Sequence, residues 1–171
     1  MFHFLKKVLA SAAAIYAVLV MFMIVFAGSD SAIALEIDKT SRTVPLNSSG
    51  EQLTLTTEQF MLGQHKFNSS CAQCHIDGGT KPNPDVDLST QALALATPAR
   101  DSISSLIDYL NYPTTYDGLQ SLAEFHPSVL NLDLFPKMRD LNKEDLEAIA
   151  GYILAEPKII GDQWAGGKPK R

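Results

Sequence analysis

The chain has 171 residues, a net charge of −5 at pH 7, 46% hydrophobic residues and 19% charged residues. This composition excludes a disordered chain, and the acidic balance argues against a nucleic-acid-binding protein, which needs clustered Lys and Arg. The length allows one domain after removal of a targeting segment.

The first 34 residues have the pattern of a cleaved secretory signal. Two lysines precede an almost wholly apolar run at 8–27, and Ala32 and Ala34 are the small residues that a signal peptidase requires. We expect cleavage after Ala34, which leaves residues 35–171 as one exported domain. The alternative is a retained membrane anchor, because the apolar run is roughly long enough to span a bilayer.

The mature chain is predicted to be mostly α-helical, with a small β-hairpin or extended segment near its N-terminus. Apolar and polar residues alternate on both sides of the turn-forming segment 47–50, which indicates the hairpin. Thr56 and Gln59 have the spacing of a capping box, which predicts a helix leading toward residue 70. The expected apolar face of this helix consists of Phe60, Gly63 and Phe67.

Helical periodicity and capping residues recur further along the chain. The additional segments expected to be helical are 90–96, 101–109, one or two turns within 119–125, and a last helix that begins at Asn142. Asp101 is the expected N-cap of the second of these segments. Pro157 is expected to end the last helix, because proline lacks the N–H group that continues the hydrogen-bond pattern.

Residues 71–75 read CAQCH, the C-x-x-C-H motif of covalent haem attachment. Thiols three residues apart can reach two neighbouring vinyl groups of a porphyrin, and the next residue projects its imidazole toward the iron. A redox dithiol needs no following histidine, and a zinc site wants its histidines close together, unlike His75 and His126. We predict one covalently bound haem c attached to Cys71 and Cys74, with His75 as an axial iron ligand.

The second axial ligand has four candidates among the histidines and methionines. Met61 and His65 lie on the helix that enters the haem motif and therefore belong to the side of His75. His126 and Met138 both precede the last helix, and the residues alone leave the choice between them open. The choice matters because histidine–methionine ligation raises the haem potential, whereas a second imidazole is expected to lower it.

Several stretches beyond the haem motif resemble the extrinsic cytochrome c-550 family of photosystem II. They are ALATPARD at 94–101, YPTTYDG at 112–118, EFHPS at 124–128, FPKMR at 135–139, IAGYIL at 149–154 and WAGGK at 164–168. The haem motif is common to all c-type cytochromes, but the YPTTYDG and HPS stretches are far more specific. The resemblance covers essentially the whole of residues 35–171.

The resemblance implies a mostly α, class I-like cytochrome c fold that carries one haem. It also implies that His75 and His126 are the two axial ligands, which makes Met138 a packing residue near the haem. The first long helix is then expected to cross the last one at a contact formed by Gly63, Phe67, Gly151 and Tyr152.

The function implied by the resemblance is that of an extrinsic subunit in the thylakoid lumen, peripheral to the membrane. Such a subunit binds the photosystem II core and the other extrinsic subunits, stabilises the manganese–calcium cluster and supports retention of calcium and chloride. We expect no enzymatic activity, since the sequence contains no evident nucleophile–base pair.

The sequence also allows two other functions. A diffusible electron-transfer cytochrome c of the lumen or periplasm is favoured if Met138 binds the iron. A specialised paralogue is suggested by residues 169–171, which replace the paired aromatic residues with which many family members end. The sequence also has Ala99 where the family commonly has proline.

Overall fold

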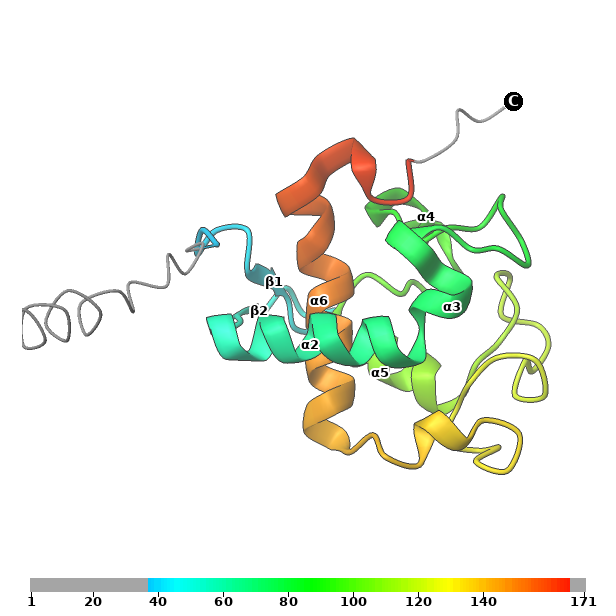
Figure 1. Cartoon of the computed structure of the whole chain (residues 1–171). Helices are drawn as coiled ribbons and strands as arrows, with labels where there is room; N and C mark the ends of the chain where they lie inside the picture. Colours follow the sequence, from blue (N-terminus) through cyan, green and yellow to red (C-terminus); the bar gives the residue numbers. More distant parts are fainter. Residues whose placement is uncertain (1–36, 167–171) are drawn as a thin grey trace, which may run out of the picture. The chain divides into compact units, whose positions relative to one another are not determined.

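The computed structural model describes residues 37–166 of the chain (Figure 1). The predicted signal segment 1–34, the expected cleavage site after Ala34 and the altered C-terminal residues 169–171 lie outside the described residues. Between residues 37 and 166, no helix combines the length and the apolar character needed to cross a membrane.

The predicted hairpin is present at the start of the described chain. Strands β1 (Thr43–Pro45) and β2 (Gln52–Thr54) pair antiparallel, with Thr43 opposite Thr54. The N–H of Leu46 donates to the Glu51 carbonyl at 2.7 Å and closes the turn. The ammonium group of Lys158 donates to the Thr43 carbonyl, which ties the hairpin to the last helix.

The helix that precedes the haem motif begins where its capping box predicts. Helix α2 (Thr57–Ser70) has Thr56 as its N-cap. The Thr56 hydroxyl accepts from the Gln59 N–H at 3.1 Å, and the Gln59 side chain accepts from the Thr56 N–H at 2.8 Å. These bonds satisfy two of the N–H groups that a helix start leaves without a helical partner.

The last long helix, α6 (Lys143–Ile160), begins after Asn142, as predicted. Asn142 Oδ1 accepts from the Asp145 N–H at 2.9 Å, and Asp145 Oδ2 accepts from the Asn142 N–H at 3.1 Å. Asp145 also receives the ammonium group of Lys66 from α2 at 3.0 Å. The cap of α6 is thus joined directly to α2.

The prediction that Pro157 ends α6 is wrong, because the helix continues to Ile160 and stops at Gly161, whose φ is +57°. Proline removes one N–H from the last turns, but Ile159 and Ile160 still pack against the hydrophobic core. The Gly161 N–H donates to the Pro157 carbonyl, so the end of the helix is closed one turn beyond the proline.

Two shorter helices, α4 (Thr90–Leu95) and α5 (Ile103–Asn111), occupy the middle of the chain. The N-cap of α5 is Ser102 and not Asp101. Ser102 has extended backbone angles, is 2% exposed and accepts from the Ser105 N–H at 3.3 Å. The Ser105 hydroxyl in turn accepts from the Ser102 N–H at 3.0 Å, and this reciprocal capping box fixes the start of the helix after Ser102.

The helical turns expected at 119–125 are reduced to a single turn. Ser121 forms an isolated antiparallel bridge with Thr114, and the N–H groups of Phe125 and His126 both donate to the Leu122 carbonyl at 2.8 Å. The chain that leads to His126 is therefore an irregular loop held by local hydrogen bonds.

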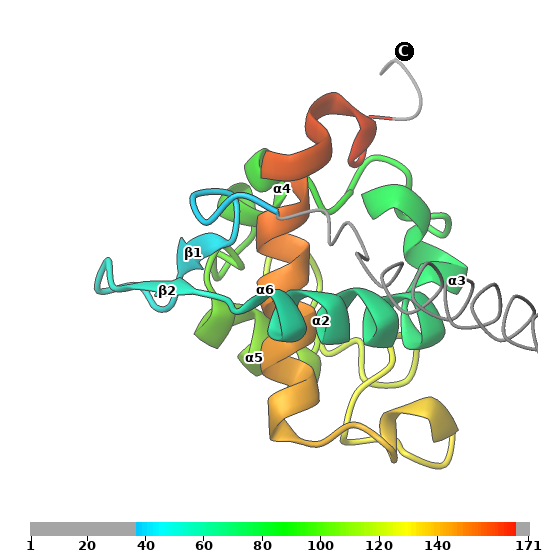
Figure 2. The same ribbon diagram turned by 60° about the vertical axis from the view of Figure 1, so that its left-hand side comes forward.

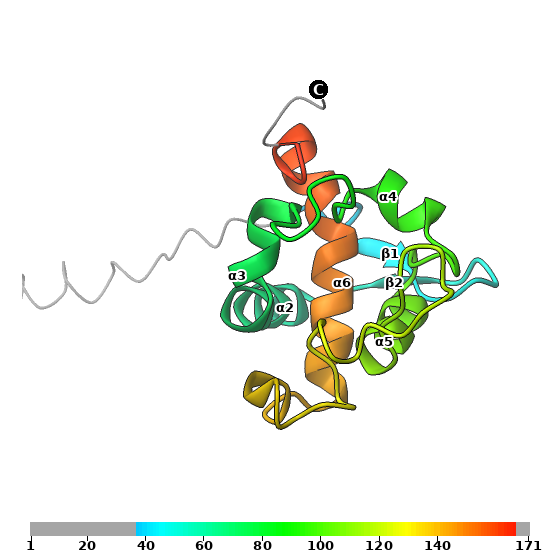
Figure 3. The same ribbon diagram turned by 90° about the vertical axis from the view of Figure 1, so that its right-hand side faces the viewer.

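Helix α6 forms the centre of the described domain. Figures 1 and 2 show α2 crossing α6, and Figure 3 shows α2 end-on at one side of α6 with α5 at the other. The crossing of α2 and α6 is very close, since a Cβ atom on Gly63 would lie 2.1 Å from the Ala148 carbonyl oxygen. Phe60 and Phe67 pack beside it on Tyr152, each with ring centroids 5.3 Å apart.

The predicted contact of α2 with α6 is confirmed for Gly63, Phe67 and Tyr152. Gly151, expected at the same contact, instead faces Leu55 at the end of the hairpin. The remaining elements are short: α3 (Ala72–His75) and the 3-10 turns η1 (Ile76–Gly78), η2 (Pro136–Met138) and η3 (Gly161–Gln163).

Candidate haem-binding site

The short helix α3 brings together the two cysteines and the first histidine of the motif. The N–H groups of Cys74 and His75 both donate to the Cys71 carbonyl, at 3.1 and 2.9 Å. The two cysteines are not joined in a disulfide. Burial raises the pKa of Cys71 to about 12, which makes this thiol a poor nucleophile for disulfide exchange.

The backbone that follows the motif packs against Trp164 and Ala165, which come after α6. Gly78 has a φ of +77°, and a Cβ atom there would lie 2.5 Å from Cε2 of the Trp164 indole. The indole N–H donates to the Leu88 carbonyl at 2.9 Å, and the Ala165 N–H donates to the Asp77 carbonyl at 2.6 Å. Only glycine fits this position without displacing the tryptophan.

The imidazole of His75 is oriented by the loop that follows it. Its Nδ1 lies 3.1 Å from the Gly79 carbonyl oxygen and 3.1 Å from the Thr80 hydroxyl. A carbonyl oxygen can only accept, so Nδ1 carries the proton and Nε2 keeps its lone pair. Burial lowers the pKa of His75, which favours this neutral form.

The imidazole of His126 is oriented in the same way from a different segment. Its Nδ1 lies 2.9 Å from the Pro127 carbonyl oxygen, which again leaves Nε2 as the nitrogen with a lone pair. The loop around it is braced by the Asn131 side chain, which donates to the Ala123 carbonyl at 2.9 Å. Burial first, and then the proximity of His75, lowers the pKa of His126 to about 4.

These two imidazoles lie next to each other, with ring centroids 6.1 Å apart and planes inclined by 53°. A metal ion sits about 2 Å from an imidazole nitrogen, so two rings that share one ion have centroids about 6 Å apart. The separation therefore fits one iron between His75 and His126. Residues 37–166 contain no cluster of three or more His, Cys, Asp and Glu that could hold a metal without a porphyrin.

The other candidate ligands occupy different environments. Met138 is 3% exposed and belongs to the hydrophobic core. Met61 is 53% exposed, and His65 also lies on the solvent-facing side of α2, as expected from the sequence. Among the candidates for the second axial position, the structure brings His126 against the ring of His75.

Two residues that the sequence did not single out connect to His126, Tyr109 directly and Arg100 through Tyr109. The Tyr109 ring meets His126 edge to face, with centroids 5.0 Å apart. The Arg100 guanidinium carbon lies 3.9 Å from the centroid of the Tyr109 ring. Arg100 belongs to the ALATPARD stretch on which the family resemblance rests, and that stretch is the only sequence signal that points to it.

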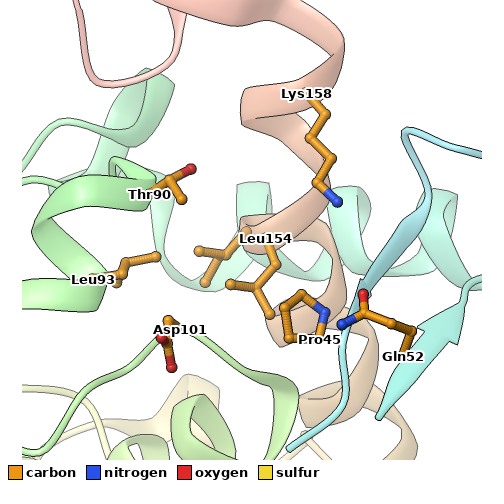
Figure 4. Close-up of a pocket in the computed structure, with 8 residues that line it drawn as sticks. Pro45, Gln52, Thr90, Leu93, Asp101, Leu154 and Lys158 are labelled. Atoms are coloured by element: carbon orange, nitrogen blue, oxygen red, sulfur yellow. The ribbon is translucent and has the colours of Figure 1, made fainter. Parts of the chain in front are cut away.

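A hollow of about 160 Å³ lies elsewhere, between the hairpin, α4 and α6 (Figure 4). Its lining includes Leu93 and Leu154, with Asp101 and Lys158 among the polar residues. None of the lining residues is a histidine or cysteine, so the hollow is separate from the candidate haem site.

Comparison with known proteins identifies the family. The sequence profile of the cytochrome c-550 domain matches residues 35–171. The chain belongs to the cytochrome c-550 family. It is 56% identical over 138 residues to photosystem II extrinsic protein V of Thermosynechococcus vestitus, an alignment that covers 81% of this chain and 85% of the relative.

Solved structures support the same assignment. The crystal structure of cytochrome c549 matches with a TM-score of 0.73 and 50% identity, covering 75% of this chain and 99% of that chain. The PsbV2 cytochrome of Thermosynechococcus elongatus matches with a TM-score of 0.60 and 33% identity, covering 72% and 87%. The predicted class I cytochrome c fold is confirmed, and a cytochrome c-550 domain implies a haem c cofactor.

Proposed function

We propose that this cytochrome c-550 is an extrinsic haem subunit of photosystem II, bound to the core and to other extrinsic subunits on the lumenal side of the thylakoid membrane. In this role it stabilises the manganese–calcium cluster and supports retention of calcium and chloride. It acts as a non-catalytic subunit. The support is its 56% identity to a relative named photosystem II extrinsic protein V.

The proposed cofactor is one haem c, attached through thioether bonds to Cys71 and Cys74. His75 and His126 are the proposed axial ligands. The observation that carries this assignment is the 6.1 Å separation of the two imidazoles, together with the carbonyl oxygen next to each Nδ1. Two imidazoles stabilise ferric iron better than an imidazole and a thioether do, so the haem potential is expected to be low.

The role in photosystem II is tested by purifying the complex from the source organism. The cytochrome is expected in stoichiometric amount, and a mild salt wash that removes it should lower oxygen evolution. Added calcium and chloride should restore part of the activity, and rebinding of the purified cytochrome should restore more. A complex that lacks the protein, with the cytochrome free in the lumenal fraction, would instead support a diffusible carrier.

The axial ligands are tested separately with the purified holoprotein. His126→Ala should keep its covalent haem but bind cyanide in the ferric state and carbon monoxide in the ferrous state. His65→Ala is the matched control, because it removes an exposed histidine from α2. A near-infrared band of methionine–iron ligation in the wild type, or a His126→Ala protein that binds neither ligand, would reject His126.

The paralogue alternative is weakened by the comparisons. The chain is 56% identical to an extrinsic protein V but 33% identical to the PsbV2 cytochrome. The chain is thus more similar in sequence to a relative named as an extrinsic protein of photosystem II, which supports the extrinsic-subunit role.

A further inference from the structure

Arg100 is a buried cation without an anionic partner in the described part of the chain. It is 8% exposed, and none of the ion pairs formed by residues 37–166 includes it. Its Nε is buried and has no hydrogen-bond partner among these residues. Burying a charge is costly unless the charge is paired and hydrogen-bonded, so the contacts that Arg100 does make are the ones to examine.

One of the two outer nitrogens of the guanidinium group, Nη2, makes two hydrogen bonds. Nη2 donates to the carbonyl oxygens of Thr114 and Thr115, at 3.0 and 2.8 Å. These residues begin the irregular connection that leads from α5 to His126. Arg100 therefore anchors the start of the loop that carries the proposed second ligand.

The same guanidinium lies over the Tyr109 ring, with its central carbon 3.9 Å from the ring centroid. The Tyr109 ring in turn meets the His126 ring at 5.0 Å, with planes inclined by 64°. A cation over an aromatic face and an edge-to-face aromatic pair are both attractive contacts with defined geometry. The three side chains thus form one continuous stack that ends on His126.

We propose that Arg100 is a positioning residue for the haem, which acts through Tyr109 and through the loop at Thr114 and Thr115 to hold His126 in its axial orientation. Its positive charge also favours the ferrous over the ferric state of the iron. The inference rests on the proposed ligation by His126 and deepens it, because it assigns the orientation of that ligand to a specific stack.

The test uses four variants of the stack in the full-length holoprotein: Arg100→Gln, Arg100→Lys, Tyr109→Phe and Tyr109→Leu. Arg42→Gln is the matched control, since Arg42 also donates to backbone carbonyls, but to those of Ile37 and Leu55 near the hairpin and not to the loop that carries His126. Three quantities are measured: the rate constant of cyanide binding to ferric haem, the g values of the low-spin ferric signal, and the midpoint potential.

Arg100→Gln is expected to speed cyanide binding about fivefold to tenfold, the range that loss of contacts of this kind produces. It should also shift the g values and make the potential more negative. Arg100→Lys should speed cyanide binding but keep a potential near that of the wild type, because the charge remains while the planar stack is lost. Tyr109→Leu should shift the g values, whereas Tyr109→Phe, which keeps the ring, should not.

Unchanged cyanide binding and g values in both Arg100→Gln and Tyr109→Leu would overturn the inference. So would an equal change in Arg42→Gln, which would show general loosening of the fold. If Arg100→Gln fails to mature, Arg100→Lys and the Tyr109 pair decide the question by the same measurements. His126→Ala distinguishes a failure of the ligand assignment from a failure of the role of Arg100. If His126→Ala leaves cyanide binding unchanged, His126 is not the ligand. If His126→Ala speeds cyanide binding and the variants of Arg100 and Tyr109 do not, only the role of Arg100 has failed.

Discussion

The crossing of α2 and α6 makes Gly63→Ala a sharp test of the packing. An alanine Cβ would lie 2.1 Å from the Ala148 carbonyl oxygen, 2.7 Å from its carbon and 2.8 Å from Tyr152 Cβ. Cβ contacts below 3.0 Å essentially do not occur, so the two helices must separate by about 1 Å. The clash is with backbone atoms, which cannot rotate away.

The loss of stability can be estimated from the contacts that weaken when α2 and α6 move apart. A gap of 0.5–1 Å removes roughly a quarter to a half of the dispersion energy of each contact across it. The two ring pairs that Tyr152 makes with α2, centred 5.3 Å apart, lie at this crossing. Because the clash is with backbone, the upper end of the usual cost of overpacking applies, about 3 kcal/mol, and alanine regains about 1 kcal/mol of helix propensity over glycine. We expect a net loss of about 2 kcal/mol in the free energy of unfolding.

Urea unfolding of the holoprotein, followed by circular dichroism, measures this loss. Gly151→Ala is the matched control within α6. Its new Cβ would lie 2.8 Å from the two methyl carbons at the end of the Leu55 side chain, which can move. We expect that control to stay within about 1 kcal/mol of the wild type. A Gly63→Ala protein as stable as Gly151→Ala would refute the close helix crossing.

Two further predictions concern a buried carboxyl group and the haem attachment. Burial raises the pKa of Glu156 above its ordinary value of 4.5, so the folded state loses stability as the pH rises from about 4.5 through the raised pKa. Glu156→Gln should therefore raise the free energy of unfolding by about 1 kcal/mol at pH 7 and have little effect at pH 4. Urea titrations in which the variant gains more stability at pH 4 than at pH 7 would contradict the raised pKa. Replacing both Cys71 and Cys74 by serine should abolish covalent haem, and haem that survives denaturing electrophoresis in that double variant would disprove the attachment.

The parts of the fold that the sequence predicted well are those determined within one helical turn. The predicted capping pair at Thr56 and the predicted N-cap at Asn142 each act on groups three residues away, and both helices begin where these residues indicate. The cysteines and His75 also share a single turn, so the motif alone places them together.

The two errors in the helix boundaries have different causes. Ser102 takes the place of Asp101 as the cap of α5 because Ser105, three residues further on, completes a capping box with it. The chain remains helical after Pro157 because the following isoleucines still pack on the core. The first cause is local and follows from the spacing of the two serines, whereas the second depends on contacts with distant parts of the core.

The candidate site also contains some residues that local spacing predicts and others whose positions depend on distant parts of the chain. The motif predicts Cys71, Cys74 and His75 from spacing, whereas the proximity of His126 to His75 depends on the path of the chain between them. The residues alone left the choice between His126 and Met138 open, and the resemblance to the family was needed to favour the histidine clearly. The contact of Tyr109 with His126 has no local signal, since the two residues lie on either side of an irregular loop.

The number of residues between His75 and His126 means that the proposed haem would also stabilise the fold. His75 and His126 are 126 − 75 = 51 residues apart, and iron bound to both closes a loop of about that length. A permanent cross-link of this size reduces the entropy of the unfolded chain by the equivalent of about 4 kcal/mol, which is an upper bound for a coordinate bond. His126→Ala should therefore lower the free energy of unfolding toward that bound. Free imidazole should restore the low-spin spectrum of the variant without restoring its stability, because a free ligand closes no loop. If added imidazole restored both, the haem would bind its ligand without bracing the fold, and stability would depend on the filled pocket instead.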